Sequence, residues 1–456
     1  MKHADIIQKL NLEQKCALLS GETVFTTRAL PGKGIPAITL SDGPNGVRKQ
    51  AGAADHLGLN PSVPATCFPT SSATACSWDE KLGEAVGEAL GEEAAAQEVA
   101  VLLGPGLNIQ RSPLCGRDFE YFSEDPILAG RMAAAYVRGI QKNGISACPK
   151  HFAVNSQELR RMASDSVLDE RTLRELYLTG FEIVVKEAKP KTIMTSYNLI
   201  NGTYANENAH LLQDILRKDW GFDGAVVTDW GGSNDHALGV KNGSTLEMPC
   251  PGGDSIRELM KAVQGGKISE ADVDARLDEM LELVLSTHAA VEKAPRTFDA
   301  AAHHKLARRA AAESIVLLRN EGGILPLKPN EKLAVIGDFA ETPRYQGAGS
   351  SAVNALQVDT LLDSIKADDS GITFVGYASG FERQGAADAE KLEEAVALAK
   401  KADTVLLCLG LDELRESEGL DRSDMKLAEN QQQLLAAVAA VNPNACLLYT
   451  SPSPRD

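Results

Sequence analysis

The chain has 456 residues, which is too long for a single ordinary hydrophobic core and therefore predicts two domains. Hydrophobic residues make up 43% of the chain and charged residues 24%, a composition typical of globular proteins and unlike that of disordered ones. The formal net charge of -17 disfavours binding to nucleic acid or to anionic membranes, so we expect neither as a partner.

The cysteines and the N-terminal segment bear on the compartment. The eight cysteines are scattered singly, without the spacing of a zinc site or a redox motif, and we expect them to be reduced. The first residues contain no apolar stretch long enough for a signal peptide, and no run of about 18 apolar residues occurs. The sequence thus predicts a cytoplasmic protein.

Short apolar runs alternate with longer amphipathic segments between about residues 36 and 290, which is the pattern of β/α units. The predicted strands are Pro36–Leu40, Ala100–Leu103, Ile145–Cys148, Thr192–Tyr197 and Ala225–Thr228. The predicted helices, rich in Ala, Leu and Glu, include Asp79–Val99, Leu128–Lys142 and Arg171–Glu187. The pattern favours a parallel sheet or barrel, and an irregular barrel stays open because only five strands are found.

A second α/β layer follows a predicted linker at residues 291–312, which combines a Lys-Ala-Pro-Arg stretch with an Ala-rich helical stretch. Its predicted elements are strands at Ser314–Leu318, Leu333–Ile336, Ile372–Val375 and Thr404–Leu409, and a helix at about Ala387–Lys401. The apolar pattern ends at Cys446, and the following residues resemble translated adapter sequence. We therefore predict a barrel domain over residues 1–290, a second domain over 313–446 and a non-native tail over 447–456.

An apolar strand that ends in Asp229 carries the sharpest local signal. The run Gly224-Ala-Val-Val-Thr-Asp229-Trp230-Gly231 delivers a carboxylate directly into a glycine-rich turn. Active sites of β/α barrels lie at the carboxyl ends of the strands, and Trp230 could serve there as a platform for a sugar ring. Asp is also a favoured N-cap residue, so position alone leaves both interpretations of Asp229 open.

Cationic and polar side chains follow other predicted strands. Lys150 and His151 end one strand, with Arg161 shortly after, and such donors could orient the hydroxyl groups of a sugar. His151 could equally be a histidine that satisfies local hydrogen bonds, and Arg117 with Glu120 could be a surface ion pair. The other polar residues at strand ends are Asp42, Arg48, Arg117 and Tyr197. Their shared position is the geometry expected when several strands line one pocket.

Two loops of the predicted second domain contain further notable sequence. Gly347-Ala-Gly-Ser350-Ser351 lacks the Gly-Lys-Ser/Thr ending of a phosphate-binding loop, so we reject nucleotide binding. The run from Arg415 to Arg422 contains Glu416 and Glu418 and is typical of a solvated loop. It could also bring a carboxylate over the mouth of the barrel, where two carboxylates would flank a glycosidic bond.

These segments together resemble glycoside hydrolase family 3, in particular its bacterial β-glucosidases, from about residue 9 to 445. The resemblance is carried by Ser41-Asp-Gly-Pro-Asn-Gly-Val-Arg48, Gly116-Arg-Asp-Phe-Glu-Tyr, Lys150-His-Phe-Ala, Thr195-Ser-Tyr-Asn, Val227-Thr-Asp-Trp-Gly, Gly347-Ala-Gly-Ser-Ser and Glu418-Gly-Leu-Asp-Arg422. It implies a (β/α)8-type barrel followed by an incomplete α/β sandwich domain. It also implies exo-acting, retaining hydrolysis of terminal β-D-glucosyl residues from small-molecule or oligosaccharide β-glucosides.

By the same resemblance Asp229 is the nucleophile and Glu418 the general acid/base, with Glu416 less favoured. The residues expected to bind the sugar are Asp42, Arg48, Arg117, Lys150, His151, Arg161, Tyr197, Trp230 and Ser350. This chemistry requires Asp229 to be ionised beside cationic donors and Glu418 to be held protonated by less polar surroundings. It requires no metal and no organic cofactor.

The chain departs from the family pattern in two places. Thr245 precedes Leu246-Glu-Met-Pro249 where relatives carry Asp, and we expect this change to alter a contact behind the sugar pocket. The chain also stops inside the second domain, whereas related enzymes continue into a β-sandwich domain, so an inactive carbohydrate-binding fragment stays open. β-Xylosidase and other activities of the family, a Schiff-base lyase that uses Lys150, the aglycone preference and a homo-oligomer stay open as well.

Overall fold

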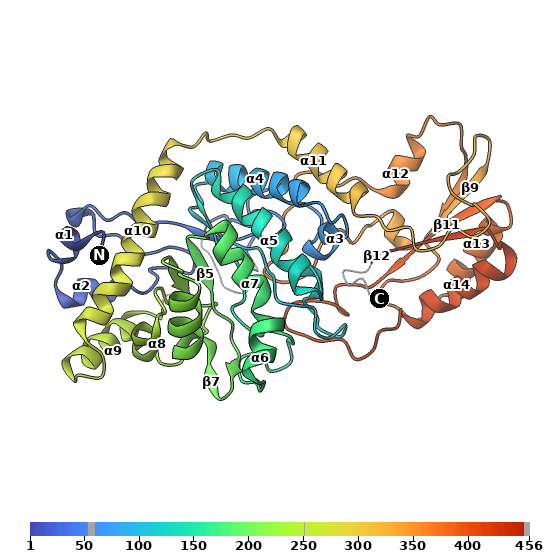
Figure 1. Cartoon of the computed structure of the whole chain (residues 1–456). Helices are drawn as coiled ribbons and strands as arrows, with labels where there is room; N and C mark the ends of the chain where they lie inside the picture. The colour runs from blue at the N-terminus through green and yellow to red at the C-terminus, as the bar shows by residue number, and fades with distance from the viewer. Residues whose placement is uncertain (53–59, 250, 451–456) are drawn as a thin grey trace.

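The computed structural model describes residues 1–52, 60–249 and 251–450. Figure 1 shows a larger N-terminal part, blue to yellow, beside a smaller C-terminal part in orange and red. Helix α11 (Ala300–Glu313) lies between them, at the place of the predicted linker.

The larger part is an irregular barrel of short parallel strands. These are β1 (Leu40–Asp42), β2 (Val101–Leu103), β3 (Ser146–Ala147), β5 (Thr192–Met194) and β8 (Ala225–Val227). β1, β2 and β3 pair in parallel, as do β5 and β8. A parallel bridge between Phe152 and Thr195 joins the two groups.

Isolated bridges close the ring. Leu246 pairs with Val227 and Glu247 with Ser20, both in parallel, while the hairpin that follows Ser20 pairs Gly21 with Thr27 in antiparallel orientation. From that hairpin an antiparallel bridge leads to Thr39, directly before β1. These closing segments are too short to produce a recognisable apolar run, which explains why the sequence revealed five strands.

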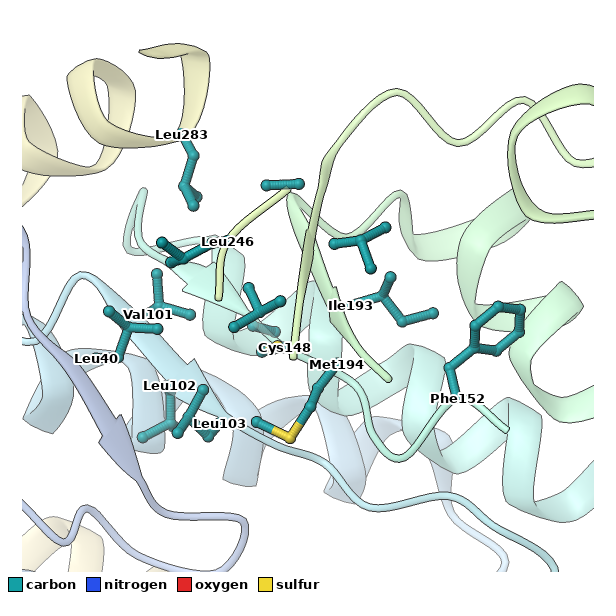
Figure 2. Close-up of a cluster of buried hydrophobic side chains, with 14 of the residues drawn as sticks. Leu40, Val101, Leu102, Leu103, Cys148, Phe152, Ile193, Met194, Leu246 and Leu283 are labelled. Atoms are coloured by element: carbon teal, nitrogen blue, oxygen red, sulfur yellow. The ribbon is translucent and has the colours of Figure 1, made fainter. Parts of the chain in front are cut away.

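Apolar side chains from successive strands fill the barrel interior. Figure 2 shows Leu40, Val101 and Leu246 gathered together, with Leu283 reaching them from helix α10 (Glu270–Lys293), while Ile193 lies apart from them on the side of Phe152. All of these side chains are buried. Strands covered on both faces are continuously apolar, which is the pattern that allowed the sequence to predict them.

Two long helices that pack against each other cover part of the barrel, α4 (Glu80–Ala96) and α5 (Pro126–Gln141). Each begins at an aspartate whose side chain accepts backbone N–H groups of the first turn, Asp79 for α4 and Asp125 for α5. The helix predicted over residues 171–187 is broken into α6 (Glu170–Thr172), α7 (Thr179–Ile183) and wider turns between and after them.

The remaining α-helices and strands of the larger part are short, apart from one twelve-residue helix. They are α1 (Ala4–Ile7), α2 (Leu12–Ala17), α3 (Ser71–Ala75), β4 (Asp165–Ser166), β6 (Leu199–Ile200), β7 (Thr203–Tyr204), α8 (His236–Asn242) and α9 (Gly253–Gln264).

The C-terminal part is a parallel sheet in the order β10-β9-β11-β12 with helices packed on it. Its elements are β9 (Lys332–Ile336), α12 (Leu361–Lys366), β10 (Thr373–Ala378), α13 (Ala389–Ala399), β11 (Thr404–Gly410), α14 (Glu429–Val441) and β12 (Ala445–Thr450). Every residue of β11 is buried, as expected for a central strand between two neighbours.

Two predictions about this part are wrong. Ser314–Leu318 forms no strand, and Leu318 is 71% exposed, because a strand needs a partner and this apolar run pairs with none of the described strands. The regular structure also continues past Cys446, since β12 pairs with β11 in parallel through Thr450. The predicted tail thus begins inside a strand.

Candidate active site

Polar side chains from several barrel strands meet at the carboxyl end of the ring. Asp42 ends β1, Lys150 and His151 follow β3, Tyr197 follows β5, and Asp229 follows β8. His151 Nε2 lies 3.7 Å from the Asp229 carboxylate. The charge of Lys150 acts on both Asp42 and Asp229. The shared position at strand ends therefore brought these side chains into one site, as the sequence predicted.

Asp229 lies at the bottom of this site and is 9% exposed. Its Oδ1 accepts a hydrogen bond from the backbone N–H of Trp230 at 2.8 Å. Its Oδ2 accepts no hydrogen bond of regular geometry from the described residues, although the Tyr197 side chain interacts with this carboxylate. Burial raises the pKa of Asp229, while the charges of Arg117 and Arg161 act in the opposite direction. This oxygen is thus available to a bound molecule.

The alternative interpretation of Asp229 as a helix N-cap is wrong. The next helix, α8, is capped by Asp235, whose Oδ1 accepts the backbone N–H of Leu238 at 2.9 Å. Asp229 therefore performs no capping in this loop.

Arg117, Glu120 and Lys150 form a buried charge cluster. The Arg117 guanidinium lies 2.7 Å and the Lys150 ammonium 2.9 Å from opposite oxygens of Glu120, which is 0% exposed. The interpretation of Arg117 and Glu120 as a surface ion pair is therefore wrong. Burial would lower the pKa of Lys150, but the charges of Glu120 and Asp42 raise it. A Schiff-base lysine needs a neutral amine, so this environment argues against a lyase.

His151 belongs to the same network and is neutral. Its Nε2 must accept from Arg117 Nη2 at 3.1 Å, because a guanidinium can only donate. Its proton is then on Nδ1, which donates to the Tyr121 hydroxyl at 3.2 Å. Burial and the charges of Arg117 and Lys150 hold the pKa of His151 well below its ordinary value. His151 is thus more than a local structural histidine, since it connects Arg117 to the Asp229 side of the site.

Arg161, Tyr197 and Trp230 form an aromatic and cationic wall. The Arg161 guanidinium lies 4.8 Å from the centre of the Tyr197 ring, and the Tyr197 hydroxyl donates to the Trp230 carbonyl at 2.9 Å. The indole N–H of Trp230 donates to the Val24 carbonyl at 2.7 Å, and its ring packs against Phe25. These contacts fix the Trp230 ring beside Asp229, where the sequence predicted a platform.

A loop of the C-terminal part brings Glu418 to this site. Its Oε1 accepts from Arg161 Nη1 at 2.8 Å and lies 3.5 Å from Arg117 Nη1. Its Oε2 accepts from the backbone N–H of Ser350 at 2.7 Å. A Cβ at Gly349 would lie 2.4 Å from Glu418 Cβ, so the close packing of these two loops requires glycine there.

Glu416, the less favoured acid in the sequence analysis, lies outside the pocket. It is buried, and its Oε2 accepts from Arg344 Nη1 at 2.8 Å while its backbone carbonyl accepts from Arg344 Nη2 at 2.9 Å. A carboxylate bound in this way serves the packing of the loop, and Glu418 is the one that faces the arginines of the barrel.

Asp421 fastens the same loop to the barrel. Its carboxylate accepts the backbone N–H groups of Gly116 at 3.1 Å, Glu158 at 2.9 Å and Leu159 at 2.8 Å. A Cβ at Gly116 would lie 1.7 Å from the Leu420 carbonyl oxygen, so any larger residue would separate the two parts. The site is therefore assembled from both parts of the chain.

Arg48 and Ser350 make further contacts between the barrel and the C-terminal part. Arg48 Nη1 donates to the Gly349 carbonyl at 2.8 Å, and its backbone N–H donates to the Asp42 carbonyl at 2.9 Å. Arg48 thus links the end of β1 to the Gly349–Ser350 segment, which packs against the loop that carries Glu418. Ser350 contributes its backbone N–H to Glu418 within the described contacts.

The charge state expected for Glu418 is opposite to the one that the structure favours. Burial opposes ionisation of Glu418, but Arg117, Arg161 and the Ser350 hydrogen bonds outweigh it and hold the pKa well below its ordinary value. The pKa of Asp229 is raised by burial. The prediction that less polar surroundings keep Glu418 protonated is therefore wrong for this arrangement, because two guanidinium groups face that carboxylate.

Comparison with known proteins identifies the family. The model of the glycosyl hydrolase family 3 N-terminal domain matches residues 53–283, and that of the family 3 C-terminal domain matches residues 315–456. The chain belongs to glycosyl hydrolase family 3. It is 45% identical over 452 residues to the thermostable β-glucosidase B of Acetivibrio thermocellus, a match that covers 98% of this chain and 60% of that protein.

Other family 3 proteins are also similar to the chain in sequence and structure. An exo-α-(1→6)-L-arabinopyranosidase of Bifidobacterium longum is 43% identical over 458 residues and is also covered to 60%. The crystal structure of a β-glucosidase from Bifidobacterium adolescentis superposes with a TM-score of 0.91 at 42% identity, covering 98% of this chain and 64% of that one. β-Glucosidase 3B of Thermotoga neapolitana, solved with glucose, gives 0.89 at 33% identity, covering 100% and 69%. The chain thus spans less than two thirds of the length of the curated relatives.

The departure from the family 3 pattern at Thr245 lies outside the sugar-binding cluster. Its hydroxyl donates to Glu279 at 2.7 Å and accepts from the backbone N–H of Val226. Glu279 in turn pairs with Arg217 and Arg276. Thr245 therefore contacts a separate buried ion cluster, and its expected effect on a contact behind the proposed sugar site stays a prediction.

Sequence reasoning missed several residues of this family 3 site. Glu120 was considered only as a possible partner in a surface ion pair, and Tyr121 and Asn108, which hold the His151 ring and backbone, were not singled out. Glu158 was missed as well, although it is buried and accepts from Arg161 at 2.8 Å. The available signal was the placement of each glutamate three residues from an arginine, Glu120 after Arg117 and Glu158 before Arg161.

Membrane-spanning helices and metal-binding clusters were sought in the described residues of this family 3 chain. None of their helices is both long enough and apolar enough to cross a membrane. Within the same ranges, no three His, Cys, Asp or Glu side chains are grouped as a metal site would require.

Proposed function

We propose that the chain is a retaining, exo-acting β-glucosidase in which Asp229 is the nucleophile and Glu418 the general acid/base. The observation that carries this proposal is the pairing of a buried Asp229, with one carboxylate oxygen left without a hydrogen bond of regular geometry among the described residues, with Glu418 from the other part of the chain. The names of the relatives support glucosides as substrates.

The reaction proceeds in two displacements. Asp229 Oδ2 attacks the anomeric carbon and the bond to the aglycone oxygen breaks, while Glu418 gives a proton to that oxygen. Glu418, now ionised, takes a proton from water, whose oxygen attacks the glycosyl-enzyme and releases Asp229. The charges of Arg117, Arg161 and Lys150 favour the ionised form of Asp229 that the attack needs, against the effect of its burial.

The remaining site residues hold the terminal sugar. Asp42 accepts from hydroxyl groups, while Arg117, Lys150 and His151 surround the sugar from the strand ends and Trp230 supplies a flat face. Arg161, Tyr197, Arg48 and Ser350 complete the wall between the two parts. Because these groups are neutral or paired by nearby carboxylates, the pocket suits an uncharged sugar better than an anionic one.

Covalent trapping tests this function. A 2-deoxy-2-fluoro-β-glucoside of dinitrophenol should label the peptide that contains Asp229, as read by mass spectrometry, and Asp229→Ala should lose turnover roughly 10⁴-fold or more. Asp223→Ala is the matched control, because its carboxylate is 88% exposed. Label on another residue, or turnover by Asp229→Ala near that of the parent, would refute the assignment. An α-L-arabinopyranoside belongs in the substrate panel because of the Bifidobacterium relative.

A further inference from the structure

Glu158 is a buried carboxylate beside the proposed acid/base, and the reaction as described does not use it. It is 3% exposed. Its Oε2 accepts from Arg161 Nη1 at 2.8 Å and from the backbone N–H of Gly419 at 2.8 Å. Gly419 directly follows Glu418, so Glu158 contacts both the loop that carries the acid/base and one of the arginines that face it.

A single guanidinium nitrogen lies between two carboxylates. Arg161 Nη1 is 2.8 Å from Glu158 Oε2 and 2.8 Å from Glu418 Oε1. Arg117 Nη1 is likewise shared, at 4.0 Å from Glu158 Oε1 and 3.5 Å from Glu418 Oε1. Glu158 and Glu418 therefore compete for the same two cations.

Other titratable groups also face Glu158 and Glu418. Cys115 and Tyr121 face Glu158 from the barrel loop that carries Arg117. The groups that face Glu418 are Asp42, Asp229 and Tyr197 from the strand ends and Glu120 from the turn that follows Arg117. No further cation accompanies Arg117 and Arg161 in direct contact with the two carboxylates among the described ion pairs.

In this arrangement the competition for the two arginines favours the ionised form of Glu418 over that of Glu158. Burial raises the pKa of Glu158, while Arg117 and Arg161 hold that of Glu418 well below its ordinary value. Both guanidinium groups favour the ionised form of Glu418, which suits a base and disfavours a proton donor. Protonation of Glu418 becomes favourable only when Arg161 is drawn to another carboxylate, and Glu158 is the one in contact with it.

We propose that Glu158 is a positioning residue that takes up the charge of Arg161 when Glu418 is protonated, and so allows Glu418 to serve as the general acid. The inference rests on the proposed function, because it assigns a role toward Glu418 in that reaction. Glu158 does not touch the substrate; it acts through Arg161 and through the backbone of Gly419.

Glu158→Gln tests the charge of this group while keeping an oxygen that accepts from Gly419. Without the second carboxylate, Arg161 stays with Glu418, so the acid step is lost and the base step is retained. Turnover of cellobiose, whose leaving group needs a proton, should fall about tenfold or more, while that of 2,4-dinitrophenyl β-glucoside should fall much less. The basic limb of the pH profile for cellobiose should shift to lower pH, and azide should not accelerate the variant.

Asp421→Asn is the matched control for a merely structural role. Asp421 holds the backbone of Glu158 and Leu159 but contacts neither arginine in the described structure, so its loss should lower turnover of both substrates alike without moving the pH profile. Glu158→Asp, which restores the charge, should recover part of the cellobiose activity.

The outcomes separate the inference from the proposed function. Equal losses for both substrates in Glu158→Gln, with an unchanged basic limb, would overturn the inference and leave the proposed function standing. Acceleration of Glu158→Gln by azide would overturn it too, since it would show that the base step had failed. A parent chain that hydrolyses no dinitrophenyl glucoside would refute the proposed function, and the inference would fall with it.

Discussion

Replacement of Glu418 and of Glu416 by glutamine should have opposite consequences. Both carboxylates belong to one loop and stand two residues apart, yet Glu418 faces the arginines of the barrel and Glu416 pairs with Arg344 inside the C-terminal part. Glu418→Gln should therefore impair chemistry with little effect on stability, whereas Glu416→Gln should impair stability.

The structure allows both magnitudes to be worked out. In Glu418→Gln the two arginines keep other carboxylates, Arg117 with Glu120 and Arg161 with Glu158, so the loss in unfolding free energy should be about 1 kcal/mol. Removal of one partner of a fully buried ion pair, as in Glu416→Gln, should cost about 3 kcal/mol. General acid catalysis contributes about 10²–10⁴-fold, which corresponds to about 3 to 5 kcal/mol in the barrier.

Leaving-group dependence separates the two variants. Glu418→Gln should hydrolyse cellobiose about 10²-fold or more slowly, yet it should still release dinitrophenolate from the activated glucoside in a burst. Azide should then restore turnover, because it attacks the glycosyl-enzyme without a general base. Urea unfolding followed by circular dichroism measures the stability difference on the same samples.

Three results would refute this reasoning. If Glu416→Gln showed the selective loss and the azide rescue, the acid would lie two residues earlier. If Glu418→Gln unfolded far more easily than the parent, the shared arginines would not be satisfied as described. If the parent chain itself behaved like Glu418→Gln, the loop would not deliver its carboxylate to the substrate.

Two further predictions concern Asp42 and the contact between the two loops. Burial raises the pKa of Asp42 to about 6, and the ionised form accepts more strongly from sugar hydroxyls than the protonated form, so kcat/KM should fall as the pH drops through about 6. Asp42→Asn should remove that titration, and an unchanged acidic limb would contradict the prediction. Gly349→Ala should displace Glu418 and slow cellobiose hydrolysis about tenfold or more. Gly322→Ala is the control, because Gly322 also has a positive φ but no neighbour within 4 Å of an added Cβ, and it should not slow the reaction. Equal activities of the two variants would contradict the packing argument.

The sequence predicted the barrel strands well where burial is complete. The runs that became β2 and β8 are covered on both faces and are continuously apolar as a consequence, while those of β3 and β5 each contain one buried polar residue, Ser146 and Thr192, which hydrogen-bond to each other. The segments that close the ring, around Ser20 and Thr26, are held by single bridges to distant residues, and no local pattern encodes such pairing. For the same reason the apolar run at Ser314–Leu318 was wrongly predicted to be a strand.

The division into residues 1–290, 291–312 and 313–446 stays a prediction. Helix α10 runs on to Lys293, and Val353 from the later segment packs in the same core cluster as the barrel strands. A boundary drawn from composition cannot register such contacts, because they depend on which loop of the second layer reaches back to the first.

The site shows a different limit of sequence reasoning. Position at strand ends was enough to gather Asp42, Lys150, His151 and Asp229, since the carboxyl ends of parallel strands share one rim. The charge state of Glu418 could not be found in that way, because it depends on which guanidinium lies nearest and on which other carboxylate claims it. Sequence position gives the members of a charge network, but their pKa values come from three-dimensional distances.

The distances around Glu418 determine how it can act as the proposed acid/base between Arg117 and Arg161. A glutamate that must donate a proton in one step and accept one in the next needs surroundings that favour each state in turn. The arginines around Glu418 favour the ionised state, which suits the second step. The protonated state needs a competing anion close by, and the shared Arg161 nitrogen makes Glu158 that competitor. The two carboxylates are therefore better understood as one coupled unit than as an acid/base with an unrelated structural neighbour.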